Sequence, residues 1–246
     1  MQDSQKYTIT GQAKLVLLKD FLAGRDKKSR VLDVGGTMHD LEFIQSLGFE
    51  ELKVSNNSEA ELEGCGKDGL LFDITKPNNK IKQFDIIIFM DVLEHLVKPD
   101  EALVNINAML TKKGFLILTT PNLASLFNRV FLLLGWSLPN YSAASIKTGN
   151  PIIKAKISTS FRDSFPHKSV FTPNQLKELL TLYGFDVIKH QGYDYGSPKA
   201  SSSGGNYNFS RKLLNNILPA SMKEGIFIVC KKERVVSTEA LVQKFS

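Results

Sequence analysis

The residues best suited to chemistry come at the ends of short apolar segments. Asp33 lies in the apolar segment 31–34, which runs directly into Gly35 and Gly36. Glycines at such a turn let the backbone approach a ligand closely, because no Cβ stands in the way. A helix that begins after the turn offers N–H groups to a carboxylate or a phosphate. The turn fits a ligand-binding loop, and it also fits an ordinary connection between a strand and a helix.

Polar side chains follow two later segments in the same manner. Asn56 lies 23 positions after Asp33. Its amide can accept a hydrogen bond from a ligand hydroxyl, although without the help of a charge, and a simple polar turn fits this position as well. Asp73 follows the apolar residues 70–72. It suits either a hydrogen bond to a ligand or the capping of a turn.

Histidine titrates near neutral pH, so the histidines are the candidates for a general base. His95 follows the apolar segment 84–90, and His167 lies in a later basic segment. Each could take a proton from an acceptor molecule, and each could equally brace a loop. The four histidines show no spacing typical of a metal site, so we expect no metal; they are His39, His95, His167 and His190.

Composition excludes several classes of protein. The chain has 246 residues, enough to bury a large core without cross-links. The two cysteines, Cys65 and Cys230, lie 165 positions apart, which rules out a disulfide scaffold and a cysteine-based zinc module. The first ten residues are polar and lack the apolar core of a signal peptide, so we expect a cytoplasmic protein.

The net charge of +6 is concentrated in one segment. Residues 123–170 contain six basic residues and one acid, which accounts for +5 of the total. A nucleic-acid-binding protein usually shows a broader basic excess, so nucleic acid is not expected as a partner. The segment also carries apolar residues at helical spacing. Three interpretations of this segment stay open. It could be a solvated lid over a ligand site, a lid that attracts an anionic acceptor molecule to that site, or a peripheral contact with an anionic membrane.

The candidate residues need a scaffold that brings the ends of several segments together. Apolar segments that alternate with amphipathic helical patterns predict an α/β fold with an open, mostly parallel sheet, in which ligands bind beyond the carboxyl ends of the strands. The continuous apolar run 84–90 is typical of a parallel strand buried on both faces. The predicted strands are residues 30–34, 52–54, 70–72, 84–90, 114–119, 185–188 and 225–230, and the predicted helices are residues 12–22, 40–47, 99–110, 123–134 and 173–183.

Four motifs, taken in order, resemble one known family. They are residues 31–37 (VLDVGGT), 84–96 (FDIIIFMDVLEHL), 119–122 (TTPN) and 165–176 (FPHKSVFTPNQL). They are similar to class I S-adenosylmethionine (SAM)-dependent methyltransferases of the small-molecule type, methyltransferase types 11 and 23. The resemblance implies a Rossmann-like seven-stranded sheet with helices on both faces, an antiparallel last strand and SAM as the cofactor.

The resemblance also implies a domain organisation and a set of cofactor residues. Residues 1–29 would form an N-terminal helical segment, 30–232 the methyltransferase domain with 123–170 as an acceptor-side lid, and 233–246 a tail. The implied cofactor residues are Asp33, Gly35, Gly36, Thr37, Asn56, Asp73, Met90 and Asp91. This chain departs from the family pattern because Thr37 and His39 stand where glycines are common, and Asn56 stands in place of an acid.

The resemblance implies methyl transfer, an activity of the EC 2.1.1 type. We expect a small-molecule, glycan or lipid-linked acceptor that is methylated at oxygen, with His95 and His167 as the candidate bases. Alternatives are a catalytically degenerate SAM-binding or scaffold subunit and an NAD-type oxidoreductase. The oxidoreductase would need a complete Gly-x-Gly-x-x-Gly turn and an acid after the second strand, and the sequence supplies neither.

Overall fold

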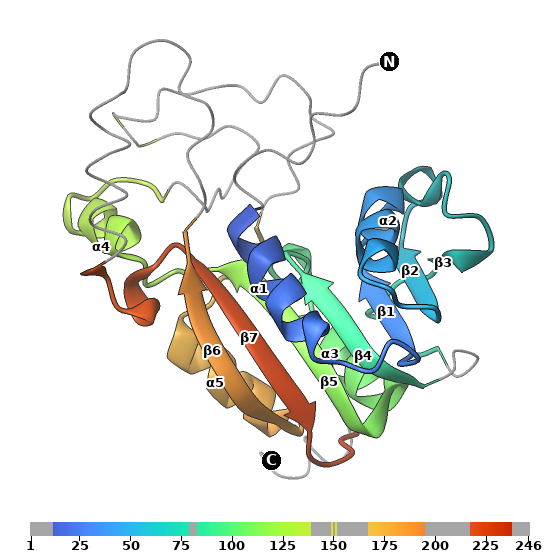
Figure 1. Cartoon of the computed structure of the whole chain (residues 1–246). Helices are drawn as coiled ribbons and strands as arrows, with labels where there is room; N and C mark the ends of the chain where they lie inside the picture. The colour runs from blue at the N-terminus through green and yellow to red at the C-terminus, as the bar shows by residue number, and fades with distance from the viewer. Residues whose placement is uncertain are drawn as a thin grey trace, which may run out of the picture.

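The candidate residues are carried by a seven-stranded sheet of order β3-β2-β1-β4-β5-β7-β6 (Figure 1). The computed structural model describes residues 12–78, 83–138, 149, 151, 167–194 and 217–237. The strands are β1 (Val31–Val34), β2 (Leu52–Asn56), β3 (Gly69–Leu71), β4 (Phe84–Met90), β5 (Leu110–Pro121), β6 (Phe185–Tyr193) and β7 (Gly225–Lys232). The strand order reverses at β1 and β4, so the switch point of the sheet lies between these two strands.

Helices cover both faces of the sheet (Figure 1). The α-helices are α1 (Gln12–Ala23), α2 (Met38–Ser46), α3 (Pro99–Met109), α4 (Leu126–Leu133) and α5 (Pro173–Leu182). Short 3-10 helices are η2 (Ala60–Leu62), η3 (Gly66–Asp68), η4 (Leu93–His95) and η5 (Ala220–Met222). Apolar residues of α3 and α5 form one buried cluster with the sheet, and those of α1 and α2 form a second. The predicted fold class is confirmed.

Strand direction determines which side chains meet. Strands β1 to β5 pair in parallel, and β7 runs antiparallel to both of its neighbours, β5 and β6, as the resemblance implied. In register, Val34 lies opposite Ser55, and Met90 lies opposite Thr119. The carboxyl ends of the parallel strands therefore share one edge of the sheet, where polar residues that follow different strands come together.

Element boundaries differ from prediction where local hydrogen bonds decide them. The bounds of β4 are as predicted. Helix α2 begins at Met38 and not at Asp40, because the backbone N–H and the hydroxyl of Thr37 both donate to the Asp40 carboxylate, at 2.8 and 2.9 Å. Strand β6 continues to Tyr193, because it pairs with β7 as far as Gly225.

The predicted lid is described only in part. Helix α4 lies within the predicted helix 123–134 and begins after Ser125, whose hydroxyl accepts a hydrogen bond from the Asn128 N–H at 3.3 Å. Of the six basic residues in this segment, Arg129 and Lys168 lie in the described part of the chain. The other four, Lys147, Lys154, Lys156 and Arg162, lie outside the described residues.

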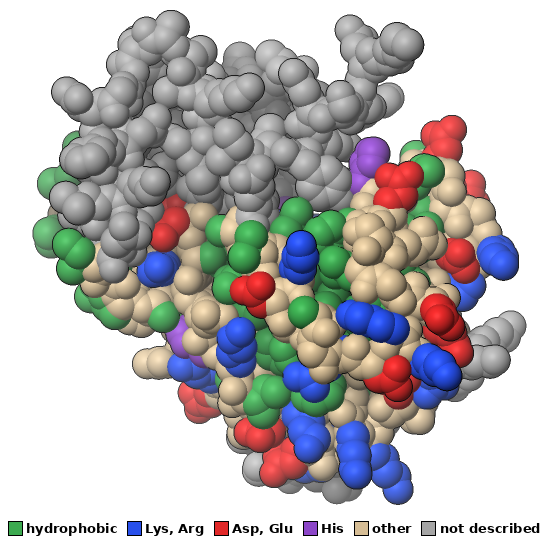
Figure 2. Space-filling model, viewed as in Figure 1, with side chains coloured by type: hydrophobic (Ala, Val, Ile, Leu, Met, Phe, Trp, Pro, Cys, Tyr) green, Lys and Arg blue, Asp and Glu red, His purple; other side chains and the backbone are tan. Residues whose placement is uncertain are grey.

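The described surface carries charges of both signs. On the face that shows α1, basic and acidic side chains are interspersed (Figure 2). Several of them pair locally, for example Lys53 with Asp68 at 2.8 Å and Lys98 with Glu101 at 2.8 Å. In the part of the chain that the structure describes, no helix has the length and apolar character needed to cross a membrane.

Candidate active site

The turn after β1 leaves little room for a side chain at either of its two glycines. Gly35 has a φ of +81°, a backbone conformation that side chains disfavour, and its N–H donates to the Ser55 carbonyl of β2 at 2.7 Å. A Cβ on Gly35 would lie 2.4 Å from Cγ2 of Val92. A Cβ on Gly36 would lie 2.3 Å from Oδ2 of Asp33. Gly35 is therefore required by its backbone conformation, and a side chain at Gly36 would displace Asp33.

Asp33 lies beneath this turn as a buried carboxylate. Only 6% of the residue is exposed. Burial first, and the negative charge of Asp40 second, raise the pKa of Asp33 well above its usual range, while the positive charge of Lys14 opposes the shift. Among the described residues, none donates a hydrogen bond to the Asp33 carboxylate. A buried carboxylate in this setting is stabilised by a cation, so the end of β1 suits a positively charged ligand group.

Thr37 and Asn56, which depart from the family pattern, hold the turn in place. The N–H and the hydroxyl of Thr37 donate hydrogen bonds to Asp40 at the start of α2, as described above. The Asn56 amide donates to the Gly36 carbonyl at 3.2 Å, and Oδ1 of Asn56 accepts from the N–H of Ser58 at 3.3 Å. Asn56 therefore ties the end of β2 to the glycine turn, and its contact with a cofactor remains a prediction.

Asp73 has a local structural role in the turn after β3. One carboxylate oxygen accepts hydrogen bonds from the N–H of Thr75 at 3.0 Å and from the Thr75 hydroxyl at 2.7 Å. The other oxygen lies 3.8 Å from Nζ of Lys76. The hydrogen bond from the Thr75 side chain is the main reason that the pKa of Asp73 lies below its usual value. Asp73 is thus an ionised turn residue, and its role toward a ligand remains a prediction.

Asp91, directly after Met90 at the end of β4, is the point on which three other elements converge. It has a φ of 55° and forms an ion pair with Lys14 of α1. Its Oδ1 accepts a hydrogen bond from the Thr119 hydroxyl of β5 at 2.7 Å and lies 3.4 Å from the hydroxyl of Tyr193 at the end of β6.

Sequence reasoning missed two of these partners. No local pattern singles out Lys14 or Tyr193, because each lies in an ordinary amphipathic or apolar segment far along the chain from Asp91. Thr119 could have been found, since it belongs to the TTPN motif at the end of a predicted strand. Met90 is half-buried and packs against the cluster beneath α1 and α2.

Glu94 is the second buried carboxylate of the site. The residue is 1% exposed, and its Oε2 accepts a hydrogen bond from the Thr120 hydroxyl at 3.1 Å. Burial, together with the negative charge of Asp91, raises the pKa of Glu94 to about 8. Thr119 and Thr120, which are consecutive on β5, therefore hold the carboxylates of Asp91 and Glu94, respectively.

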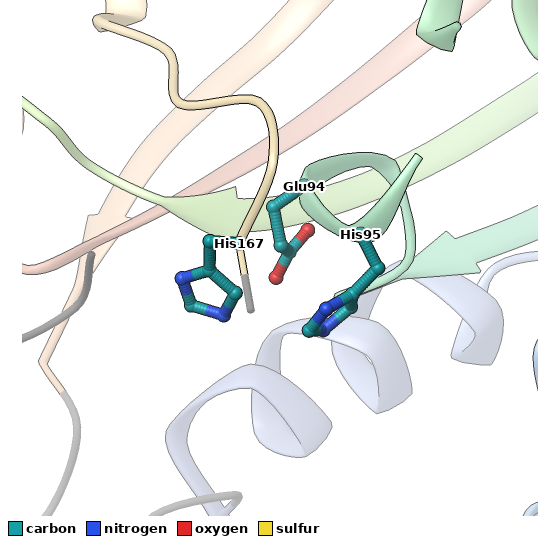
Figure 3. A group of neighbouring side chains, drawn as sticks. All are labelled: Glu94, His95 and His167. Carbon is teal, nitrogen blue, oxygen red and sulfur yellow. The ribbon is translucent and has the colours of Figure 1, made fainter. Parts of the chain in front are cut away.

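The structure brings His95 and His167 together next to Glu94 (Figure 3). The two imidazole rings meet edge to face, with 4.9 Å between their centroids. His95 lies on η4, and His167 lies in the segment that leads to α5. The N–H groups of Lys168 and Ser169 both donate to the Glu94 carbonyl, at 2.7 and 3.0 Å, and so join the two segments. The two candidate bases thus form one cluster.

This architecture is found in known methyltransferases. The family described as "Methyltransferase domain" matches residues 7–190. Among solved structures, a SAM-dependent methyltransferase from Archaeoglobus fulgidus has 20% identity and a TM-score of 0.55, and the match covers 90% of this chain and 92% of that one. No curated protein matches the chain.

Two further structures share the fold at low identity. The plantazolicin methyltransferase BpumL, in complex with a pentazolic desmethylPZN analog and SAH, has 18% identity and a TM-score of 0.56, over 94% of this chain and 88% of that one. The cyclase SpnF has 16% identity and a TM-score of 0.53, over 88% and 81%. These likenesses show the fold alone, whereas the family match covers most of the sequence. The chain belongs to the methyltransferase-domain family.

Proposed function

We propose that the protein is a SAM-dependent methyltransferase that methylates an oxygen atom of a small acceptor. The observation that carries the proposal is the buried Asp33 carboxylate beneath the Gly35–Gly36 turn, without a hydrogen-bond donor among the described residues. The ammonium group of the amino-acid part of SAM is a cation that fits this position. When bound, SAM supplies a methyl group on a sulfonium, which is already activated for displacement.

The remaining cofactor residues would position the rest of SAM along the edge of the sheet. Asn56 has an amide oxygen at the end of β2 that can accept a hydrogen bond from a ribose hydroxyl. Asp73 would accept a hydrogen bond from the adenine amino group after β3. The backbone of Met90 and Asp91 would lie beside the cofactor after β4. Gly35, Gly36 and Thr37 shape the turn that passes over it.

His95 and His167 are proposed to face the acceptor. Because the methyl group is already activated, the main task of the protein is to align the acceptor oxygen with it and to exclude water. A hydroxyl acceptor must also lose its proton, and an imidazole near neutral pH can take it. The cluster of Glu94, His95 and His167 lies beside Asp91 at the carboxyl edge, since the charge of Asp91 acts on Glu94.

The segment 123–170 is proposed to select the acceptor. Its excess of basic residues favours an anionic molecule such as a carboxylate or a phosphate, glycan or lipid-linked compounds included. Helix α4 exposes several apolar side chains, among them Leu132 and Leu133, which suit a peripheral membrane contact as an adjunct.

The experiment that tests this function is calorimetric titration of the full chain with SAM, S-adenosylhomocysteine and NAD. We expect S-adenosylhomocysteine to bind with a dissociation constant in the micromolar range, within about a factor of ten, and NAD not to bind. Gly35→Val should abolish binding, because the new side chain would collide with Val92 and deform the turn. Gly24→Val is the matched control, since a Cβ there meets nothing within 4 Å.

Unchanged binding by Gly35→Val, or binding of NAD in place of SAM, would contradict the proposal. A second candidate function is a SAM-binding or scaffold subunit without activity. It is favoured by one observation, the occupation of a usual glycine position by Thr37, which caps α2 in this chain. In that case the chain would bind S-adenosylhomocysteine and transfer no methyl group to any acceptor offered.

A further inference from the structure

Three side chains that are common metal ligands converge at the carboxyl edge of the sheet. One ligand atom from each of Glu94, His95 and His167 lies within 4.8 Å of the other two (Figure 3). Glu94 and His95 are neighbours on η4, whereas His167 comes from the segment before α5, 72 positions after His95. The spacing of histidines along the chain led us to expect no metal, and spacing could not reveal this cluster.

The segments that carry the three side chains are tied together by backbone hydrogen bonds. In addition to the two N–H groups that donate to the Glu94 carbonyl, the Ser169 hydroxyl donates to the Leu96 carbonyl at 3.0 Å. The Thr120 hydroxyl donates to one oxygen of the Glu94 carboxylate and so orients it. Outer contacts of this kind orient metal ligands in proteins, so the cluster is held in place before an ion arrives.

Electrostatics also favour a cation at this point. Glu94 is 1% exposed, and Asp91 adds a second carboxylate beside it. The positive charge of Lys14 is already paired with Asp91. When Glu94 is ionised, two carboxylates share one described lysine, and a buried carboxylate without full compensation is costly. A divalent cation between Glu94 and the two imidazoles would compensate the charge of the Glu94 carboxylate.

The geometry requires only small movements. An ion placed equally between three atoms 4.8 Å apart would lie about 2.8 Å from each, so inward shifts of less than about 1 Å would reach the bond lengths of about 2.0–2.2 Å of zinc sites. We propose that Glu94, His95 and His167 bind a divalent transition-metal ion, Zn²⁺ being the first to test. Two imidazoles and one carboxylate form a ligand set that leaves coordination positions open for another molecule.

The role of the ion rests on the function proposed above. An acceptor hydroxyl that occupies an open position would become more acidic and would lose its proton to water, because a divalent cation stabilises the oxyanion. The oxygen would then form a bond to the methyl carbon of SAM. The carbon–sulfur bond would break with its electron pair on sulfur. The products are the methyl ether or ester of the acceptor, S-adenosylhomocysteine and one proton.

The metal assignment and the general-base assignment exclude each other. An imidazole that donates its lone pair to an ion cannot use it to take a proton. The two histidines lie together with a buried carboxylate, Glu94. This arrangement favours the metal assignment, because a general base would need only one histidine at this position.

The test is calorimetric titration of the full chain, stripped with a chelator, with Zn²⁺, Mn²⁺ and Mg²⁺ in turn. We expect at least one transition-metal ion to bind one-to-one with a dissociation constant below about 100 µM. His167→Ala should weaken this binding by at least about tenfold. His190→Ala is the matched control and should bind like the wild type, because His190 lies on β6 outside the cluster.

Glu94→Gln is a second variant, in which the new side chain has nearly the same shape as the original one. If His167→Ala does not fold, the metal binding of Glu94→Gln is compared with that of the wild type instead. Binding of neither Zn²⁺ nor Mn²⁺ below about 100 µM, or equal binding by the wild type and the folded cluster variants, would overturn the proposal. S-adenosylhomocysteine is titrated in parallel without metal. If S-adenosylhomocysteine binds and the ions do not, the metal site is wrong and the proposed function stands. If the ions bind at the cluster and S-adenosylhomocysteine does not bind, the metal site stands and the proposed function is wrong.

Discussion

Lys14 of α1 forms an ion pair with Asp91 at the end of β4, across 77 positions of the sequence. Both side chains are largely buried, with 22% and 25% exposed. Asp91 also accepts a hydrogen bond from Thr119, and the charge of Lys14 acts on Asp33 and Glu94 as well. One lysine from the first helix therefore offsets three carboxylates of the candidate site.

Replacement of this lysine should destabilise the protein. Lys14→Met keeps the apolar length of the side chain but leaves the carboxylates without their cation, so we expect the free energy of unfolding to fall by about 1–3 kcal/mol. Urea unfolding measures the change. Lys19→Met, on the exposed side of the same helix, should change stability by less than about 0.5 kcal/mol. Equal losses for both variants would show that the ion pair with Asp91 contributes nothing.

The buried Asp33 predicts a pH dependence of stability. Its pKa is raised in the folded state, so the folded chain binds more protons than the unfolded chain between the ordinary and the raised pKa. The contribution of Asp33 to stability should therefore fall as pH rises from about 4 through this window and stay constant above it. Asp33→Asn should remove this slope. Urea unfolding of both proteins across pH tests it, and parallel curves would contradict it.

The same carboxylate links SAM binding to proton release. A cation beside Asp33 favours its ionised form, so SAM should displace a proton wherever Asp33 is still protonated. Calorimetry in two buffers of different ionisation enthalpy measures the protons released. We expect release by the wild type and a smaller value for Asp33→Asn. Identical values would mean that the cofactor's charge lies elsewhere.

Substitution of Asp73 distinguishes a contact with the ligand from a contact within the turn. Asp73→Ala should weaken S-adenosylhomocysteine binding by about 1–3 kcal/mol if the carboxylate accepts a hydrogen bond from adenine. Thr75→Val is the matched control, because it removes the hydroxyl that bonds to Asp73 and leaves the carboxylate in place. Calorimetry and thermal unfolding are measured on both. If Asp73→Ala lowers only the melting temperature, as the control does, its role is confined to the turn.

The exposed apolar side chains of α4 predict membrane attachment. Leu133 is 87% exposed, and we expect Leu133→Ser to reduce sedimentation of the protein with anionic phospholipid vesicles by about threefold or more, since it removes a large share of the inserted apolar area. Val235→Ser serves as the control, because Val235 is 72% exposed and lies after β7. If the wild type does not sediment with the vesicles, the hypothesis of membrane contact is wrong. The anionic acceptor would then be tested through the salt dependence of the activity.

Local pattern was sufficient for the scaffold and for the glycine turn. The apolar run 84–90 predicted both ends of β4, because a parallel strand buried on both faces needs an apolar side chain at nearly every position. Gly35 was predicted from its place after an apolar segment, and its positive φ explains why a glycine stands there. Such features depend on neighbours in the sequence, and the sequence by itself determined them.

Only the tertiary structure decided which side chains share a site. The ion pair between Lys14 and Asp91 depends on how α1 packs across the sheet, and the cluster of Glu94, His95 and His167 depends on the segment before α5 returning to η4. Strand order and helix packing set these contacts, and residues far apart along the chain carry no local mark of a partner. Glu94 is adjacent to His95 in the sequence. Its burial and its approach to His167, however, depend on the fold and could not be seen in the sequence.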